Sequence, residues 1–160
     1  MSDLTTTDQE ALDTLPCLLL PMADQNLLLP TVSVAEMIPY SLPSRGSRGP
    51  DWYQGEVHWR NTLIPLVCYE MINGGSYPGV ASRSRIGILN TTGVSDDLPY
   101  IAILTQGIPR LAQVENAHVH EVEGVETKAY DLMHVAMAAE EAIIPDLAAL
   151  ERAFLELDMD

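Results

Sequence analysis

The chain has 160 residues, with 23 acidic and eight basic side chains, and its formal net charge is -15 at pH 7. A field of that sign repels nucleic acid and anionic lipid surfaces, so neither is an expected partner. Hydrophobic residues make up 47% of the chain and charged residues 19%, which excludes a disordered chain and allows one domain with a sizeable core.

The first third of the chain predicts short strands. Residues 1–13 are polar and acidic and predict a flexible segment. Leu15–Met22 and Asn26–Leu29 then predict a β-hairpin, because two apolar runs flank a polar turn. Pro30 ends the second run, and we expect a helical turn there that leads into a strand at Met37–Tyr40.

The stretch Gly55–Glu70 is the clearest hairpin. Val57 and Trp59 alternate with polar residues, which predicts a half-buried strand with Trp59 in the core, and the apolar run that follows predicts a strand buried on both faces. Asn61 suits the tight turn because it tolerates a left-handed backbone. Pro65 cannot donate a ladder hydrogen bond, so we expect a sheet edge or a bulge there.

The other predicted segments are, in chain order, a loop at Ser41–Pro50, a helical turn at Pro50–Gly55, a break at Asn73–Gly79, and strands at Ile86–Leu89, Tyr100–Thr105, Ile108–Val114, His118–Val125, Tyr130–Ala136 and Glu141–Ile144. From Leu147 to Leu155 apolar residues recur at helical spacing, with Asp146 placed to cap the helix and with Glu151 and Arg152 on its polar face. Many short strands and one terminal helix indicate a mostly-β barrel or sandwich.

The cysteines and the N-terminus indicate a cytoplasmic protein. Cys17 and Cys68 lie in apolar runs and are expected to be buried thiols that form no disulfide. No basic region opens the chain as in a signal peptide, and no apolar run approaches the roughly 18 residues that a membrane span needs.

Few residues suggest chemistry. His118 and His120 flank Val119, so both rings would project from one face of a predicted strand. A zinc site takes three or four ligands, and neither the other histidines nor the cysteines stand at ligand spacings. No Gly-x-Ser-x-Gly elbow and no phosphate-binding glycine loop is present. We therefore predict no metal, no cofactor and no enzyme. The alternative is a small mostly-β enzyme or ligand-binding barrel, whose deep pocket would gather His118, His120 and a carboxylate.

The hairpin region resembles a known family. The segment Pro50–Leu66, with the pattern P-x-W-x-x-G-x-V-x-W-R-x-x-L-I-P-L, is similar to the central signature of CheW-like domains, the coupling proteins of bacterial chemosensory arrays. Leu27–Ile38 (L-L-L-P-x-x-x-V-x-E-M-I) and Ile143–Leu150 (I-I-x-D-L-x-x-L) resemble the flanking segments of that family. The likeness covers nearly the whole chain, and its specific residues lie in the first half.

The resemblance implies a CheW-like domain over residues 14–160, made of two small five-stranded β-barrels packed together, with short helical turns and a C-terminal helix. It implies a non-enzymatic adaptor that joins the signalling tips of methyl-accepting chemoreceptors to the regulatory domain of a CheA-type histidine kinase. In the family, a groove between the barrels receives the receptor, which places Val34 in that groove. Glu36 and Arg60 become an exposed ion pair beside the binding surface, next to Asn61.

Three departures from the family pattern indicate a divergent member. Asn61 replaces the usual glycine after the arginine, Cys68 stands at an expected aspartate, and Gln106 stands where an acid is common. Additional coupling proteins of pilus-associated systems, such as the ChpC type in twitching motility, are the subtype that this divergence suggests. Such a protein could couple kinase and receptor, compete with a principal coupling protein or substitute for it. A third interpretation is an oligomerising domain without a receptor partner.

Overall fold

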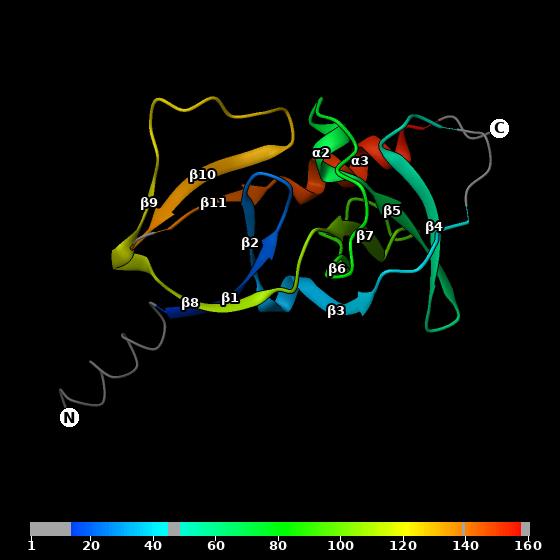
Figure 1. Cartoon of the computed structure of the whole chain (residues 1–160), viewed down its shortest axis with the longest axis horizontal. Coiled ribbons are helices and arrows are strands. Elements are labelled where there is room, and N and C mark those ends of the chain that lie inside the picture. The colour runs from blue at the N-terminus through cyan, green and yellow to red at the C-terminus, as the bar shows by residue number, and fades with distance from the viewer. Residues whose placement is uncertain (1–13, 45–48, 139, 158–160) are drawn as a thin grey trace.

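Figure 1 shows a computed structural model of the chain, which describes residues 14–44, 49–138 and 140–157. The segment 1–13, predicted to be flexible, lies outside the described residues. The elements are, in chain order, β1 (Thr14–Pro21), β2 (Asn26–Pro30), the 3₁₀ helix η1 (Thr31–Ser33), β3 (Val34–Pro39), β4 (Tyr53–Trp59), β5 (Thr62–Val67), α2 (Tyr69–Ile72), β6 (Arg85–Asn90), β7 (Tyr100–Thr105), β8 (Arg110–Glu115), the 3₁₀ helix η2 (Asn116–His118), β9 (Val119–Glu121), β10 (Asp131–Met137), β11 (Glu140–Pro145) and α3 (Leu147–Leu155).

The strands form two sheets, which confirms the predicted mostly-β architecture. One sheet has six strands in the order β8-β1-β2-β11-β10-β9, and the other has five in the order β3-β6-β7-β5-β4. The described part of the chain starts with β1 and β2 in the six-stranded sheet, forms the five-stranded sheet with β3 to β7, and returns to the first sheet for β8 to β11 (Figure 1). The resemblance implied five strands in each unit, so the first sheet has one strand more than expected.

The five-stranded sheet curls into a closed barrel. Ser44, just after β3, pairs with Glu56 of β4 through two backbone hydrogen bonds of 2.9 Å, one in each direction. Because β3 and β4 stand at opposite ends of the sheet order, this bridge joins the two edges. The buried side chains inside this barrel are Val57, Trp59, Ile64, Leu66, Ile86, Ile88, Ala102 and Leu104.

A shared core lies between the two sheets and under α3. Its buried members are Leu20, Met22, Leu27, Leu29, Val67, Tyr69, Ile72, Leu89, Ile101, Ile103, Ile143 and Leu150. Successive residues of one strand point to opposite faces, so a single strand serves two cores. In β1, Leu20 packs in the shared core while Leu19 packs inside the six-stranded sheet. In β7, Ile103 packs in the shared core while Ala102 fills the closed barrel.

A buried polar cluster reinforces this junction. The hydroxyl of Tyr69 in α2 donates to Asp131 Oδ1 of β10, 2.5 Å away, and Asn73 Nδ2 donates to the same oxygen at 3.0 Å. Burial, together with the neighbouring carboxylate of Asp131, raises the pKa of Tyr69, so its hydroxyl keeps its proton. The helix α2 was not predicted: no element was assigned between the apolar run that ends at Val67 and the break at Asn73.

Both predicted hairpins are present, since β1 pairs antiparallel with β2 and β4 with β5. The 3₁₀ helix and the strand after Pro30 are confirmed, although β3 begins at Val34. In the second half, β6, β7, β8, β10 and β11 lie at predicted strands. In β5, Ile64–Val67 are buried, as expected for a strand with cores on both faces, whereas Leu63, at the start of the predicted run Leu63–Val67, is 49% exposed.

Two predictions in the hairpin region are wrong. The helical turn over Pro50–Gly55 is one hydrogen-bonded turn, from Tyr53 N to Pro50 O, after which β4 has already begun at Tyr53. The alternation of buried residues reaches back to Tyr53 and overrides the glycine signal. Pro65 does not mark an edge, because β5 lies between β7 and β4. The pairing of β5 with β7 covers Leu66 and Val67 but not Pro65.

The C-terminal helix is confirmed with one correction. Asp146 caps α3, since its Oδ1 accepts a hydrogen bond of 3.1 Å from Ala149 N. Glu151 is not on a solvent face: it is fully buried. Its carboxylate accepts hydrogen bonds from Thr92 N at 3.0 Å and from Thr92 Oγ1 at 3.1 Å, and thereby fastens α3 to the loop between β6 and β7.

Cys17 and Cys68 are buried and free, as predicted. Burial is the main cause that raises the pKa of Cys68 to about 11, and it also raises the pKa of Cys17. In the described part of the chain, no helix is long and apolar enough to cross a membrane.

Glu151→Gln should destabilise the protein. The amide NH₂ group would face donors of the 92–94 loop, and charge-assisted hydrogen bonds would be lost, at a cost on the order of 2 kcal/mol. The measurement is urea unfolding followed by circular dichroism. The matched control is Arg152→Gln, one residue along on the exposed face, which should change the free energy of unfolding by less than about 0.5 kcal/mol. Equal losses in the two variants would contradict the buried role of Glu151.

The native thiols should be unreactive. A thiol reacts as its thiolate, and at pH 8 a group with a pKa raised to about 11 is almost entirely protonated as well as inaccessible. An aromatic disulfide reagent at pH 8 should therefore modify neither cysteine in the folded chain and both in urea. Rapid modification of one cysteine in the folded chain would show that this part of the core opens readily.

Candidate functional site

The Arg60–Asn61 turn projects from the β4–β5 hairpin. The register pairs Trp59 with Thr62, so Arg60 and Asn61 form a two-residue loop with φ of 48° and 60°. Two left-handed residues define the tight turn that matches the twist of a hairpin, and asparagine tolerates this conformation well. The prediction that Asn61 adopts a left-handed conformation is confirmed.

Arg60 is exposed and is nevertheless held in place. Its Nη2 lies 3.2 Å from Glu36 Oε1, with 69% of the arginine side chain and 42% of the glutamate side chain exposed. Its guanidinium carbon lies 4.5 Å from the centre of the Trp59 ring. An ion pair this exposed contributes roughly 0–1 kcal/mol to folding. The expected Glu36–Arg60 ion pair is therefore present, and it contributes little to the free energy of folding.

The ion pair links the two end strands of the five-stranded sheet, where the barrel closes. Glu36 comes from β3 and Arg60 from the β4–β5 turn, and β3 and β4 are the two ends of the sheet order. Trp59 beneath the arginine is 8% exposed and packs edge-to-face on Tyr100, with ring centres 4.9 Å apart. The predicted core role of Trp59 is confirmed, and the Arg60 side chain lies over this buried ring.

Val34 lies where β3 begins, against the shared core. Its pairing with Leu89 is followed by a register shift before Glu36, so these two candidate residues are separated by an irregularity in β3. Val34 is half-buried, whereas Val32, in the preceding η1, is 79% exposed. An apolar, accessible spot thus lies at the start of β3, while the ion pair marks its middle.

The three departures from the family pattern have distinct positions. Asn61 stands in the turn. Cys68 is the N-cap residue of α2 and makes no side-chain cap, a bond that an aspartate there could supply. Gln106 lies where the sheets meet, since its backbone N–H donates to Pro21 O at 2.8 Å and its Nε2 to Gly79 O at 3.2 Å. Only Asn61 therefore changes the charged turn itself.

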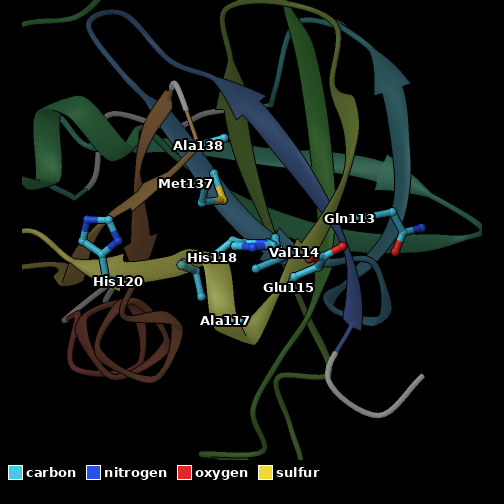
Figure 2. A pocket seen from close by; sticks show the side chains of 9 residues that line it. Gln113, Val114, Glu115, Ala117, His118, His120, Met137 and Ala138 are labelled. Carbon is cyan, nitrogen blue, oxygen red and sulfur yellow. Dashed lines mark ion pairs between the residues drawn. The ribbon is translucent and has the colours of Figure 1, made fainter. Parts of the chain in front are cut away.

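The two candidate histidines line a hollow of about 710 Å³ at the edge of the six-stranded sheet, but they do not share a strand. His118 lies in η2, with its Nδ1 2.6 Å from Glu115 Oε2, and His120 lies in β9. The prediction of one strand over His118–Val125 is wrong, because His118 ends the 3₁₀ helix η2 and β9 covers only Val119–Glu121. Figure 2 shows the ring of His120 well apart from His118.

The hollow does not have the form that the enzyme or ligand-barrel alternative requires. The side chain of His118 is 72% exposed and that of its partner Glu115 is 54% exposed, and His120 is exposed as well. Among the described residues no group of three or more His, Cys, Asp or Glu is arranged to hold a metal ion.

The polar cluster of Tyr69, Asn73 and Asp131 was missed in the sequence. Its partners lie about 60 residues apart along the chain, and no local pattern pairs them.

The family model of the CheW-like domain matches residues 16–153 of this chain. Among solved structures, the scaffolding protein TtCheW from Thermoanaerobacter tengcongensis is similar, with a TM-score of 0.70 and 16% sequence identity over 82% of this chain and 88% of that one. At this identity the likeness concerns the fold alone. Among curated proteins, none matches this sequence. Because the family model matches most of its length, the chain belongs to the family of CheW-like domains.

Proposed function

We propose that this CheW-like domain, over residues 14–160, is a non-enzymatic chemosensory adaptor. In this role it joins the signalling tips of methyl-accepting chemoreceptors to the regulatory domain of a CheA-type histidine kinase, in the cytoplasm where those parts meet. The observation that carries the proposal is the pre-organised Arg60 turn at the end of the closed barrel, in a chain of this family.

Arg60 suits recognition of an acidic group on the kinase. A planar guanidinium offers several N–H donors, and Glu36 is within reach of only one nitrogen in the structure. The turn restricts the backbone and the Trp59 ring supports the side chain, so less conformational entropy is lost on binding than for a free arginine. In a chain with a net charge of -15, an exposed cation in a defined position also helps to orient an approaching partner.

The receptor contact belongs to the apolar spot at the start of β3. Val34 is half-buried over the shared core, and the exposed Val32 enlarges this spot. An apolar face of a receptor helix would bury such side chains. Receptor and kinase would thus contact neighbouring parts of β3, its start and its middle.

The left-handed Asn61 supports the view of a divergent member. A glycine at this position would leave the turn bare, whereas the amide of Asn61 adds a donor and an acceptor beside Arg60. We propose that this side chain restricts which kinase the turn accepts, as expected for an additional coupling protein of a pilus-associated system that serves twitching motility.

Arg60→Glu should weaken kinase binding at least tenfold, because it places a carboxylate beside Glu36 and against an acidic site on the partner. The measurement is biolayer interferometry with the immobilised regulatory domain of the chemosensory kinase. The matched control is Arg110→Glu, which reverses another exposed arginine paired with a glutamate, Glu140, on the six-stranded sheet. That variant should bind within about twofold of the unaltered chain.

A charge swap separates partner recognition from barrel stability. The double variant Glu36→Arg, Arg60→Glu restores an ion pair between the two positions and still removes the cation from the turn. If Arg60 contacts the kinase, the swap binds as weakly as Arg60→Glu alone. Recovery of binding by the swap would assign Arg60 a structural role only. No kinase binding by the unaltered chain, with its fold intact, would refute the adaptor.

A further inference from the structure

The six-stranded sheet has two open edges. Its end strands are β8 and β9, which follow each other in the chain and are joined by η2 (Figure 1). Within the described ranges no strand or bridge pairs with their outer edges, whereas the Ser44–Glu56 bridge closes the other sheet. The hollow of about 710 Å³ lies between these strands, because its lining comes from β8, η2, β9 and the end of β10 (Figure 2). The unpaired backbone groups of such an edge can pair with a strand of another protein.

The strand β8 has few of the features that protect an edge. Natural edge strands are commonly short, interrupted by a bulge, or marked by lysine or proline. The six residues of β8 include no proline or lysine, and its charges stand at its two ends, so that Leu111–Val114 is uncharged. Leu111 is 77% exposed. The register of β8 with β1 runs from Arg110 to Glu115 without a shift, so the middle of this edge is regular and available for pairing.

The floor of the hollow is an incompletely covered core. Val114, Val119 and Met137 line it and pack on the buried cluster inside the six-stranded sheet, yet each is only partly buried. Successive residues of β8 point to opposite faces, so Val114 faces this cluster while Glu115 is exposed on the other face. A strand added to β8 would therefore place every second side chain over the apolar floor and the others on the side of Glu115.

The charge around this edge is strongly negative. Residues 110–141 contain seven carboxylates and only two lysine or arginine side chains. Glu115 and Glu121, in the two edge strands, are exposed, and Arg110 is already paired with Glu140. The edge therefore attracts lysine and arginine side chains. It repels any acidic segment, and equally a second copy of this chain with its net charge of -15.

We propose that β8 binds, as an added strand, an extended segment of another protein in which apolar residues alternate with lysine or arginine. The apolar side chains cover the floor of Val114, Val119 and Met137, and the cationic side chains lie beside Glu115. Backbone hydrogen bonds to the edge of β8 supply affinity, and the alternation of side chains supplies specificity. This inference concerns the six-stranded sheet and does not depend on the proposed adaptor function.

The probe is a short fluorescent peptide in which lysine and valine alternate, titrated with the full chain at physiological salt and followed by anisotropy. At saturation, amide hydrogen exchange at the outer edge of β8, within Leu111–Glu115, should slow at least about fivefold, because new backbone hydrogen bonds form there. The amides of β3 and β4 should not change. A peptide of the same composition, with its lysines grouped at one end, has the same charge without the alternation and should bind at least about tenfold more weakly.

Two variants separate local contact from the general field of the chain. Glu115→Lys should weaken binding of the alternating peptide about fivefold, because it places like charges opposite each other across the new strand pair. The matched control is Asp96→Lys, which changes the net charge equally in an exposed loop of the five-stranded sheet. Because salt screens distant charges, this control should bind within about twofold of the unaltered chain. Amide spectra of both variants verify that the fold is intact.

Four results would overturn the proposal. No binding of the alternating peptide, or binding without slower exchange in β8, would exclude an added strand. Equal binding of the two peptides, or equal losses in the two variants, would reduce the interaction to attraction between a cationic peptide and an acidic chain. Sedimentation of the chain alone as a dimer that Leu111→Lys converts to a monomer would instead assign the edge to a second copy. Kinase binding enters none of these measurements, so the adaptor function is tested separately.

Discussion

The shared core between the two sheets is the constraint on which the rest of the structure depends. Six strands contribute to two cores at once: each places some side chains in the shared core and others in the core cluster of its own sheet. These strands are β1, β2, β5, β6, β7 and β11. Since the side-chain period of a strand is two, a slip of one residue in any of these strands would exchange the two sets. The sheets therefore fix each other's register, and α3 completes the arrangement by burying Leu150 between them.

Two buried acidic side chains also hold together segments that lie far apart in the sequence. The carboxylates of Glu151 and Asp131 are buried, and each accepts hydrogen bonds from donors distant in sequence. A buried carboxylate without partners would cost several kcal/mol, so these acids connect elements that apolar contact alone would hold less specifically. These two acids stabilise the fold. Most of the other described acidic side chains are exposed and give the surface its negative field.

The candidate binding residues lie where the structure depends on them least. Arg60 and Glu36 are exposed, and their pair adds little to folding, yet the Trp59 ring and the left-handed turn hold the arginine in place. Substitutions in this turn, such as the asparagine at position 61, therefore leave the core contacts of the barrel unchanged.

The sequence by itself determined the local features of this protein. Alternation over Val57 and Trp59, the left-handed turn at Asn61 and the cap at Asp146 depend on backbone physics within a few residues, and all three are present. Likeness to the family was needed for the Glu36–Arg60 pair, whose members stand 24 residues apart. Only the tertiary structure decided that Glu151 is buried, that β5 becomes an inner strand and that Tyr69 meets Asp131. These outcomes depend on which distant surfaces meet, and a helical or strand period shows that a face exists but not what covers it.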